Sequence, residues 1–443
     1  MCSSDGHSQR MTRQIYCRIS GAPSFCLSAT RLLVLAASFG CVLTCKGVAE
    51  TTPSHWVVSW ADAVCGPPQA GPQRQRVTIH DETIREIVHL TAGGQAVRIR
   101  FSNAFGKQPL TLHSVNLSIP LTSGTIDPTS RHILAVGGNP VITIPPKQTV
   151  TTDVTNLNLA RGSDIAVSFY VAANIVAPAV HYVALQTSYT ADGDQAMAPS
   201  LREPSKSSLK LILSGVDVES RVVPYAIAAI GSSTTDGVHS TPDQNRRWTD
   251  DLFRRFTAER GDAAPSVVNL GISGNRVLHD GHGDGAALSG EAALTRFSRD
   301  VLTQPGVKYV IAFEGGNDIR LPGSGAIPIT ESVTAQQLAS GFRAMEKLAH
   351  EHRMKFIVAT ITPFEHSIPD RPQDPRWERT RLEFNDWVRH SKEIDGIIDF
   401  DLAIRDPSHP SRILADYDSG DHLHPNDAGY QAMADIVDLS LFQ

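Results

Sequence analysis

The sequence has few cysteines, and nearly all of them lie at its beginning. Of the six cysteines among 443 residues, five precede residue 46 and only Cys65 comes later. A single cysteine cannot form an internal disulfide bond, so no disulfide framework stabilises the body of the chain. A lone thiol also argues against a metal site built from thiolates.

Runs of lysine and arginine are missing as well. The formal net charge is −6, with 40 basic and 46 acidic residues. The first 49 positions hold five of the basic residues and one of the acidic residues. The remaining chain therefore carries 35 basic and 45 acidic residues, a net charge of −10. Such a balance disfavours a polyanionic partner, so we expect no binding to nucleic acid.

Long apolar runs are scarce, and the one near the N-terminus is too short to span a bilayer comfortably. It covers residues 32–45, follows Arg31 and precedes the small residues Gly47 and Ala49. This order is typical of an export signal with cleavage after Ala49, and an uncleaved membrane anchor is the alternative. We expect a leader over residues 1–49, a secreted or periplasmic mature protein, and no stable membrane insertion after cleavage.

The chain after the leader changes character near residue 222. Up to that point, short segments alternate apolar and polar side chains, as half-buried strands do, and Gly, Pro, Asn and Asp separate them. This pattern predicts a domain over residues 50–222 built as a β-sandwich or jelly roll. The expected strands include residues 83–90, 96–101, 115–119, 140–144, 164–171 and 209–213.

Beyond residue 222, apolar strands alternate with helical stretches, which is the arrangement that produces a parallel sheet. Residues 223–443 are thus predicted to form a doubly wound α/β domain with helices on both faces of the sheet. We expect strands at residues 226–230, 266–270, 309–313, 356–361 and 397–400. We expect helices at residues 245–260, 334–352, 376–390 and 425–439, the last with Pro425 as its first residue.

Polar or glycine-rich residues follow each of the expected parallel strands. In a parallel sheet the carboxyl ends of the strands lie on one edge, where ligands usually bind. These sequence-distant groups are therefore expected to converge on one crevice. They are Gly-Ser-Ser at 231–233, Gly-Ile-Ser-Gly-Asn at 271–275, Gly-Gly-Asn-Asp at 315–318, Thr-Pro-Phe at 362–364 and Asp-His-Leu-His at 421–424.

The strand ends contain the groups that a serine hydrolase needs. Ser233 is the candidate nucleophile, His424 is the candidate base, and Asp421 could orient its imidazole. A developing oxyanion needs hydrogen-bond donors, for which the candidates are the backbone N–H groups of Ser233 and Gly274 and the side-chain amide of Asn317. Each signal is weak alone, but their order and their shared position at strand ends reinforce one another.

The blocks at residues 231–237, 271–275, 315–318 and 421–424 resemble the four blocks of SGNH hydrolases, also called GDSL esterases/lipases. The resemblance implies an SGNH, flavodoxin-like fold for residues 223–443. It also implies a triad of Ser233, Asp421 and His424, with Ser233, Gly274 and Asn317 as the oxyanion hole. The layout with a preceding β-rich domain is similar to that of secreted GDSL-like acylhydrolases.

One position departs from the family's pattern. The first block usually reads Gly-Asp-Ser, whereas this chain has Ser232 in place of the Asp. That Asp is not a triad member, so its loss leaves activity possible but changes the hydrogen bonding beside the nucleophile. Two adjacent serines also make the nucleophile ambiguous, and the Thr-Asp-Gly at residues 235–237 favours Ser233.

We therefore expect a serine esterase that cleaves carboxylic esters through an acyl-enzyme, without a metal or an organic cofactor. The favoured function is carbohydrate O-deacetylation, with an acetylated polysaccharide as the expected substrate. The alternatives are a lipase, lysophospholipase or general carboxylesterase, and a non-catalytic glycan-binding protein. Exposed aromatics on the β-rich domain would favour a glycan, and a broad apolar lip would favour a lipid. We expect Trp56 and Trp60 to anchor a core rather than to form a sugar platform.

Overall fold

The structure is a computed structural model that describes residues 53–67, 76–122, 124–282, 286–324, 327–368 and 374–443. The predicted export signal and its cleavage position after Ala49 lie outside these residues. Residues Thr51–Gln443 form one compact unit. None of the helices within the described ranges combines the length and the hydropathy needed to cross a bilayer.

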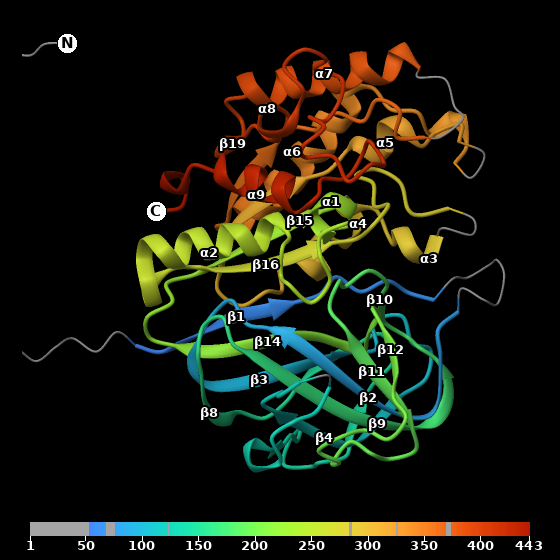
Figure 1. Cartoon of the computed structure of the whole chain (residues 1–443), viewed down its shortest axis with the longest axis vertical. Helices are drawn as coiled ribbons and strands as arrows, with labels where there is room; N and C mark the ends of the chain where they lie inside the picture. The colour runs from blue at the N-terminus through green and yellow to red at the C-terminus, as the bar shows by residue number, and fades with distance from the viewer. Residues whose placement is uncertain (1–52, 68–75, 123, 283–285, 325–326, 369–373) are drawn as a thin grey trace, which may run out of the picture. The chain divides into compact units, whose positions relative to one another are not determined.

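The first part of this unit, residues 55–220 and named the β part below, consists of antiparallel strands (Figure 1). They are β1 (His55–Ala61), β2 (Thr78–His89), β3 (Gly94–Ser102), β4 (Leu110–Ser118), β5 (His132–Ile133), β6 (Ile142–Ile144), β7 (Thr149–Thr151), β8 (Thr155–Leu159), β9 (Asp164–Val176), β10 (Val180–His181), β11 (Ser188–Asp192), β12 (Ser205–Ser207), β13 (Lys210–Leu211) and β14 (Leu213–Ser220). One sheet has the order β1-β14-β3-β7, with β8 also on β3. The other has the order β12-β11-β2-β9-β4-β5, with β6 also on β4, and β10 pairs with β13.

Side chains from the two larger sheets of the β part meet in one core. Phe101 of β3 and Phe169 of β9 are fully buried, and their rings pack edge to face with centroids 5.6 Å apart. Val97 and Ile99 on β3 and Val167 on β9 belong to the same cluster. The expectation of a β-rich, antiparallel first half is therefore confirmed, with two sheets facing each other across a shared core.

The second part, residues 226–443 and named the α/β part below, is built on one parallel sheet with the order β16-β15-β17-β18-β19. These strands are β15 (Ala226–Gly231), β16 (Ser266–Gly271), β17 (Val307–Phe313), β18 (Lys355–Ala359) and β19 (Gly396–Ile398). The helices are α1 (Ser233–Asp236), α2 (Trp248–Arg260), α3 (Ala286–Ser289), α4 (Ala293–Asp300), α5 (Gly316–Arg320), α6 (Ala335–Glu351), α7 (Pro375–His390), α8 (Phe400–Ile404) and α9 (Asp427–Asp435).

The two faces of β15 pack against different helices, because successive residues of a strand point to opposite sides of the sheet. Ala226, Ala228 and Ile230 belong to the core that includes buried residues of α4, α6 and α7. Ile227 and Ala229 belong to the core that includes buried residues of α2, α8 and α9. Helices therefore cover both faces, which confirms the doubly wound arrangement.

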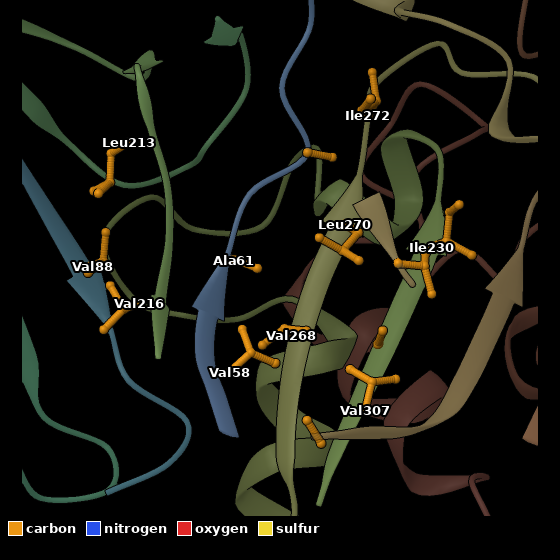
Figure 2. Close-up of a cluster of buried hydrophobic side chains, with 14 of the residues drawn as sticks. Val58, Ala61, Val88, Leu213, Val216, Ile230, Val268, Leu270, Ile272 and Val307 are labelled. Carbon is orange, nitrogen blue, oxygen red and sulfur yellow. The ribbon is translucent and has the colours of Figure 1, made fainter. Parts of the chain in front are cut away.

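The β part and the α/β part share a hydrophobic core. Strand β1 runs beside β16, and Ser266 Oγ donates a hydrogen bond of 2.6 Å to the Val58 carbonyl (Figure 1). Figure 2 shows Val58 and Ala61 of β1 in the same cluster as Val268 and Leu270 of β16. The parallel sheet that carries the candidate site therefore rests directly on the β part.

Several predicted boundaries differ from the observed ones, and three of the differences have a clear local cause. The strand expected at residues 209–213 is interrupted at Ile212, whose φ of +70° takes the backbone out of the extended conformation between β13 and β14. The strand expected at residues 397–400 ends early because the Asp399 side chain accepts the Leu402 N–H and caps α8. Pro425 precedes the last helix rather than beginning it, because Asn426 is the N-cap of α9.

Candidate active site

Ser233 lies where the central strand β15 turns sharply into α1. Gly231 makes this turn possible, since a Cβ there would lie 2.1 Å from Thr235 Oγ1 and 2.6 Å from the Phe313 carbonyl oxygen. The helix begins with Ser233 itself, and its first turn is closed by the Asp236 N–H donating to the Ser232 carbonyl at 2.8 Å. The nucleophile candidate is thus held at the carboxyl edge of the sheet by backbone bonds.

Ser233, His424 and Asp421 form a continuous hydrogen-bonded chain. Ser233 Oγ is 2.7 Å from His424 Nε2, and His424 Nδ1 is 2.5 Å from Asp421 Oδ2. Because a carboxylate only accepts hydrogen bonds, Nδ1 carries the proton and leaves Nε2 to accept the Ser233 hydroxyl proton. The three predicted triad residues are therefore brought together in the order nucleophile, base and orienting acid.

The Asp421 carboxylate is fixed by its own loop. Its Oδ1 accepts the N–H groups of Leu423 at 3.0 Å and His424 at 2.8 Å, and the Ser419 hydroxyl at 3.1 Å. Burial alone would raise the pKa of Asp421, but the hydrogen bonds from the His424 ring and backbone outweigh burial and hold the pKa below its usual range. Asp421 therefore remains ionised and can stabilise a positively charged His424.

The predicted oxyanion donors come from two loops that are bonded to each other. Asn317, on α5, donates one N–H of its side-chain amide to the Asn275 carbonyl at 2.9 Å. An amide nitrogen has two N–H groups, so the second can donate to a substrate oxygen. Gly274 has a φ of +79°, and a Cβ there would lie 2.5 Å from Ser289 Oγ. Glycine is thus required beside Asn275, where the loop passes the site.

Asp318 provides a second connection between the same two loops. Its carboxylate accepts the N–H of Val277 at 2.8 Å and the N–H of Leu278 at 3.1 Å. Burial raises the pKa of Asp318 to about 6, and the hydrogen bonds from these two amides oppose that rise. The role of Asp318 in joining the two loops was not predicted from the sequence. Its one sequence signal was its place directly after Asn317.

A small cavity opens beside the nucleophile. It is lined by residues that include Ser233, Asn317, Ile361, Phe364 and Leu423, and its volume is about 30 Å³. That volume suits a group of a few heavy atoms, since a cavity of roughly 10–15 Å³ measured in this way holds one water. The nucleophile and one oxyanion donor therefore face a space of about the size of a short acyl group.

The site lies within a segment that matches a known protein family. The sequence model described as the GDSL-like Lipase/Acylhydrolase family matches residues 229–432, which include all of the strand-end groups above. Residues 229–432 belong to the GDSL-like lipase/acylhydrolase family. With this GDSL-like domain, the chain is a carboxylic ester hydrolase of the SGNH/GDSL type. No curated protein matches the chain.

Several solved structures resemble the GDSL-like domain. One is a GDSL-like lipase from Bacteroides thetaiotaomicron (18% identity, TM-score 0.34, covering 49% of this chain and 88% of that one). Another is an alpha/beta hydrolase from the metagenome of Lake Arreo (20% identity, TM-score 0.35, covering 50% of this chain and 95% of that one). A third is a catalytic mutant of an acetylxylan esterase from Geobacillus stearothermophilus (17% identity, TM-score 0.36, covering 48% of this chain and 92% of that one).

Ser232 of the GDSL-like domain lines the same cavity as a carboxyl group that follows the neighbouring strand. Glu314 follows β17, is 2% exposed, and lines the same cavity as Ser233. Burial raises the pKa of Glu314 well above its usual range, although Arg296 opposes the rise. Its Oε1 has no hydrogen-bond partner among the described residues. The domain thus has the buried Glu314 carboxyl, with a raised pKa, beside Ser232, the residue that stands where the family usually has an Asp.

His239 is a neighbour of the triad that sequence reasoning missed. Its Nε2 lies 3.2 Å from Asp421 Oδ2, and its ring centroid is 5.6 Å from that of His424. The residue follows α1 with a φ of +69°, and no motif surrounds it. The donor atoms of His239, Asp421 and His424 lie within 4.8 Å of one another, a grouping that could hold a cation. Sequence spacing does not predict this group, because His239 is far in the chain from Asp421 and His424.

Proposed function

We propose that this protein is an exported serine esterase that removes short acyl groups, foremost acetyl, from a carbohydrate. The observation that carries the proposal is the hydrogen-bonded chain from Ser233 through His424 to Asp421 beside a cavity of about 30 Å³. A nucleophile, a base and an orienting acid in this order are the parts that acyl transfer requires.

The reaction begins when His424 Nε2 accepts the Ser233 proton and Ser233 Oγ attacks the ester carbonyl carbon. The resulting oxyanion accepts hydrogen bonds from the backbone N–H groups of Ser233 and Gly274 and from the Asn317 amide. His424 then returns the proton to the leaving alcohol, which departs as the acyl-enzyme forms. A water molecule, deprotonated by His424, attacks the acyl-enzyme and releases the acid, and the proton returns to Ser233.

The acyl group is inferred from the size and lining of the cavity. Ile361, Phe364 and Leu423 provide apolar walls, and Phe364 is 1% exposed, so this wall lies inside the fold. An acetyl methyl fits such a space, whereas each added methylene needs further volume. A lipase or lysophospholipase acting on long acyl chains is therefore less well supported than a deacetylase.

The alcohol is inferred from the rim of the site. His239 is exposed and Asp421 is half-buried, so the rim beside His424 is polar, as recognition of a hydroxyl-rich alcohol requires. The β part offers no aromatic platform: Arg98 covers the Trp56 ring at 4.3 Å, Trp60 packs on the core, and none of the described aromatic residues of this part is exposed. We therefore infer that the GDSL-like domain alone contacts the sugar.

Export is part of the proposal because of the apolar run at residues 32–45. Cleavage after Ala49 would leave Glu50 as the first residue of the mature chain. Cell fractionation followed by N-terminal sequencing tests this directly. A mature N-terminus near residue 50 in the medium or periplasm is expected, and an intact leader in the membrane fraction would contradict it.

The substrate is tested with a panel of esters. We expect kcat/KM to be highest for p-nitrophenyl acetate and to fall steeply for butyrate and octanoate, and acetate to be released from acetylated xylooligosaccharides. Higher activity on octanoate than on acetate would replace the deacetylase with a lipase. Turnover of p-nitrophenyl acetate without release from any acetylated sugar would leave a general short-chain carboxylesterase.

A further inference from the structure

A buried histidine of the β part reaches the nucleophile helix. His181, on β10, is 4% exposed, and its Nε2 is 3.0 Å from Oδ1 of Asp236, the last residue of α1. Its Nδ1 is 2.9 Å from the Ala63 carbonyl oxygen and 2.9 Å from Asp62 Oδ1. The imidazole thus bridges the chain that follows β1 to the helix that begins with Ser233.

Both nitrogens of His181 face oxygen acceptors. The Ala63 carbonyl can only accept a hydrogen bond, so Nδ1 must carry a proton. Nε2 faces a carboxylate, which favours a proton there as well. Burial would lower the pKa of His181, but Asp62 and Asp236 outweigh burial and raise the pKa well above its usual range. His181 is therefore an imidazolium held between two carboxylates.

The second oxygen of Asp236 holds the oxyanion loop. Asp236 Oδ2 accepts the Ser273 N–H at 3.0 Å and the Ser273 hydroxyl at 2.7 Å. Ser273 is the residue directly before Gly274, a proposed oxyanion donor. Gly271 allows this approach, because a Cβ there would lie 2.3 Å from the Asp236 backbone nitrogen. One carboxylate thus connects the nucleophile helix, the oxyanion loop and the β part.

We propose that His181 is a positioning residue for the esterase, acting through Asp236 to hold the Ser273–Gly274 peptide in the orientation that binds the oxyanion. This inference rests on the proposed function and extends it, because it gives the β part a role in catalysis without contact with substrate. With His181 in place, the Asp236 carboxylate keeps a fixed direction and Ser273 cannot rotate away from α1. Without it, a buried carboxylate loses its charged partner and the loop loses its anchor.

The test combines His181→Gln and Asp236→Asn, singly and together. With active sites counted by fluorophosphonate labelling, each single variant is expected to lower kcat for p-nitrophenyl acetate by about 10- to 100-fold, since oxyanion stabilisation depends on donor position. KM should change less than threefold. The double variant should resemble either single variant, because both remove one connection.

A trifluoromethyl ketone that forms a tetrahedral adduct with serine separates positioning from folding. Its Ki should rise in proportion to the loss of kcat, whereas a purely structural role would leave kcat per labelled site and Ki unchanged. His89→Gln is the matched control, since His89 also pairs with a carboxylate in the β part, Asp164, at 2.6 Å. It should leave both values unchanged. Wild-type kcat per site in His181→Gln, or full additivity in the double variant, would overturn the proposal.

If His181→Gln does not fold, Ser273→Ala decides the question. Ser273 is only half-buried, and this change removes one of the two bonds to Asp236 while keeping the backbone N–H. We expect kcat to fall severalfold in the wild-type background and not to change in Asp236→Asn. An equal fall in both backgrounds, or none in the wild type, would contradict the inference. Failure of the proposed function itself would show differently, as turnover that survives Ser233→Ala.

Discussion

Ser233 Oγ lies 2.7 Å from His424 Nε2, although the two residues are 191 positions apart in the chain. The contact exists because β15 and the segment before α9 both end at the carboxyl edge of the parallel sheet. Asp421 continues the contact on the far side of the imidazole.

The conformation of Gly274 makes the oxyanion loop intolerant of a side chain. Gly274→Ala would place a Cβ 2.5 Å from Ser289 Oγ at a φ of +79°. We expect the backbone N–H to move and kcat to fall by about 10²-fold, as when one oxyanion donor is lost, with a smaller change in KM. Steady-state kinetics on p-nitrophenyl acetate measure both.

Gly138→Ala is the matched control for this change. Gly138 has a φ of +78°, but a Cβ there meets nothing within 4 Å, and the residue lies in the β part. It should reproduce the backbone strain of Gly274→Ala without the loss of kcat. Equal kinetic losses in the two variants would show that strain alone, and not displacement of an oxyanion donor, explains the effect.

The Ser232–Glu314 pair predicts that restoring the family's usual Asp is harmful here. Ser232→Asp would place a second carboxyl beside the buried Glu314, and two adjacent carboxyls resist ionising together. We expect the free energy of unfolding at neutral pH to fall by about 1–3 kcal/mol, the usual penalty for an uncompensated buried polar group. Urea denaturation measures it.

Glu314→Gln should rescue Ser232→Asp, because the amide keeps the size of the Glu314 side chain and removes the second ionisable carboxyl from the pair. The double variant is expected to regain at least half of the lost free energy of unfolding. A Ser232→Asp variant as stable as the wild type would show that the two positions do not interact.

Leu423 predicts the acyl preference. Leu423→Ala widens the cavity beside Ser233 from its partly exposed side. A methylene is worth about 1–3 kcal/mol in such a pocket, so the ratio of kcat/KM for butyrate over acetate should rise at least about tenfold. Leu402→Ala, an exposed leucine of α8, is the control and should leave the ratio unchanged. An unchanged ratio in Leu423→Ala would remove this cavity as the acyl site.

The His181 cluster predicts a pH dependence of stability. Burial lowers the pKa of His181, but Asp62 and Asp236 raise this pKa by more than burial lowers it. The folded pKa therefore lies above the unfolded value of about 6.5. The resulting stabilisation is complete below about pH 6.5 and is lost as the pH rises through the folded pKa. Burial raises the pKa of Glu86 and of Cys65, and the charge of His181 opposes both rises. Both residues remain when His181 is replaced by Gln.

The measurement is the difference in free energy of unfolding between the wild type and His181→Gln, followed from about pH 6 to pH 10. Effects of the shared neighbours largely cancel in this difference. It should be largest at the acidic end and shrink as the pH rises. A difference that stays constant or grows with pH would show that His181 is not held as an imidazolium.

Sequence patterns predicted the parallel sheet and its strand-end residues because both depend on short-range signals. The buried strand before Gly231 and the polar residues after it can be read within one window of sequence, and the sheet's geometry then brings the ends together. Errors arose where one residue changed the local backbone. Ile212 interrupts a strand through its positive φ, and Asp399 ends another by capping a helix.

The contacts that support the site could not be predicted in the same way. His181 meets Asp236 across 55 positions, and His239 meets Asp421 through a loop that no motif marks. Each is a single histidine whose partner is set by tertiary packing: the β part packs His181 against α1, and the loop after α1 places His239 beside the loop before α9. Such contacts depend on the tertiary arrangement rather than on spacing, so a single sequence gives no signal for them.

The most direct test of the central claim compares Ser233→Ala with Ser232→Ala. A fluorophosphonate should add once per chain to the wild type and to Ser232→Ala, with peptide mapping to Ser233, and kcat/KM for p-nitrophenyl acetate should fall by about 10⁴-fold or more in Ser233→Ala alone. Retained turnover and labelling in Ser233→Ala, or their loss in Ser232→Ala, would contradict the account.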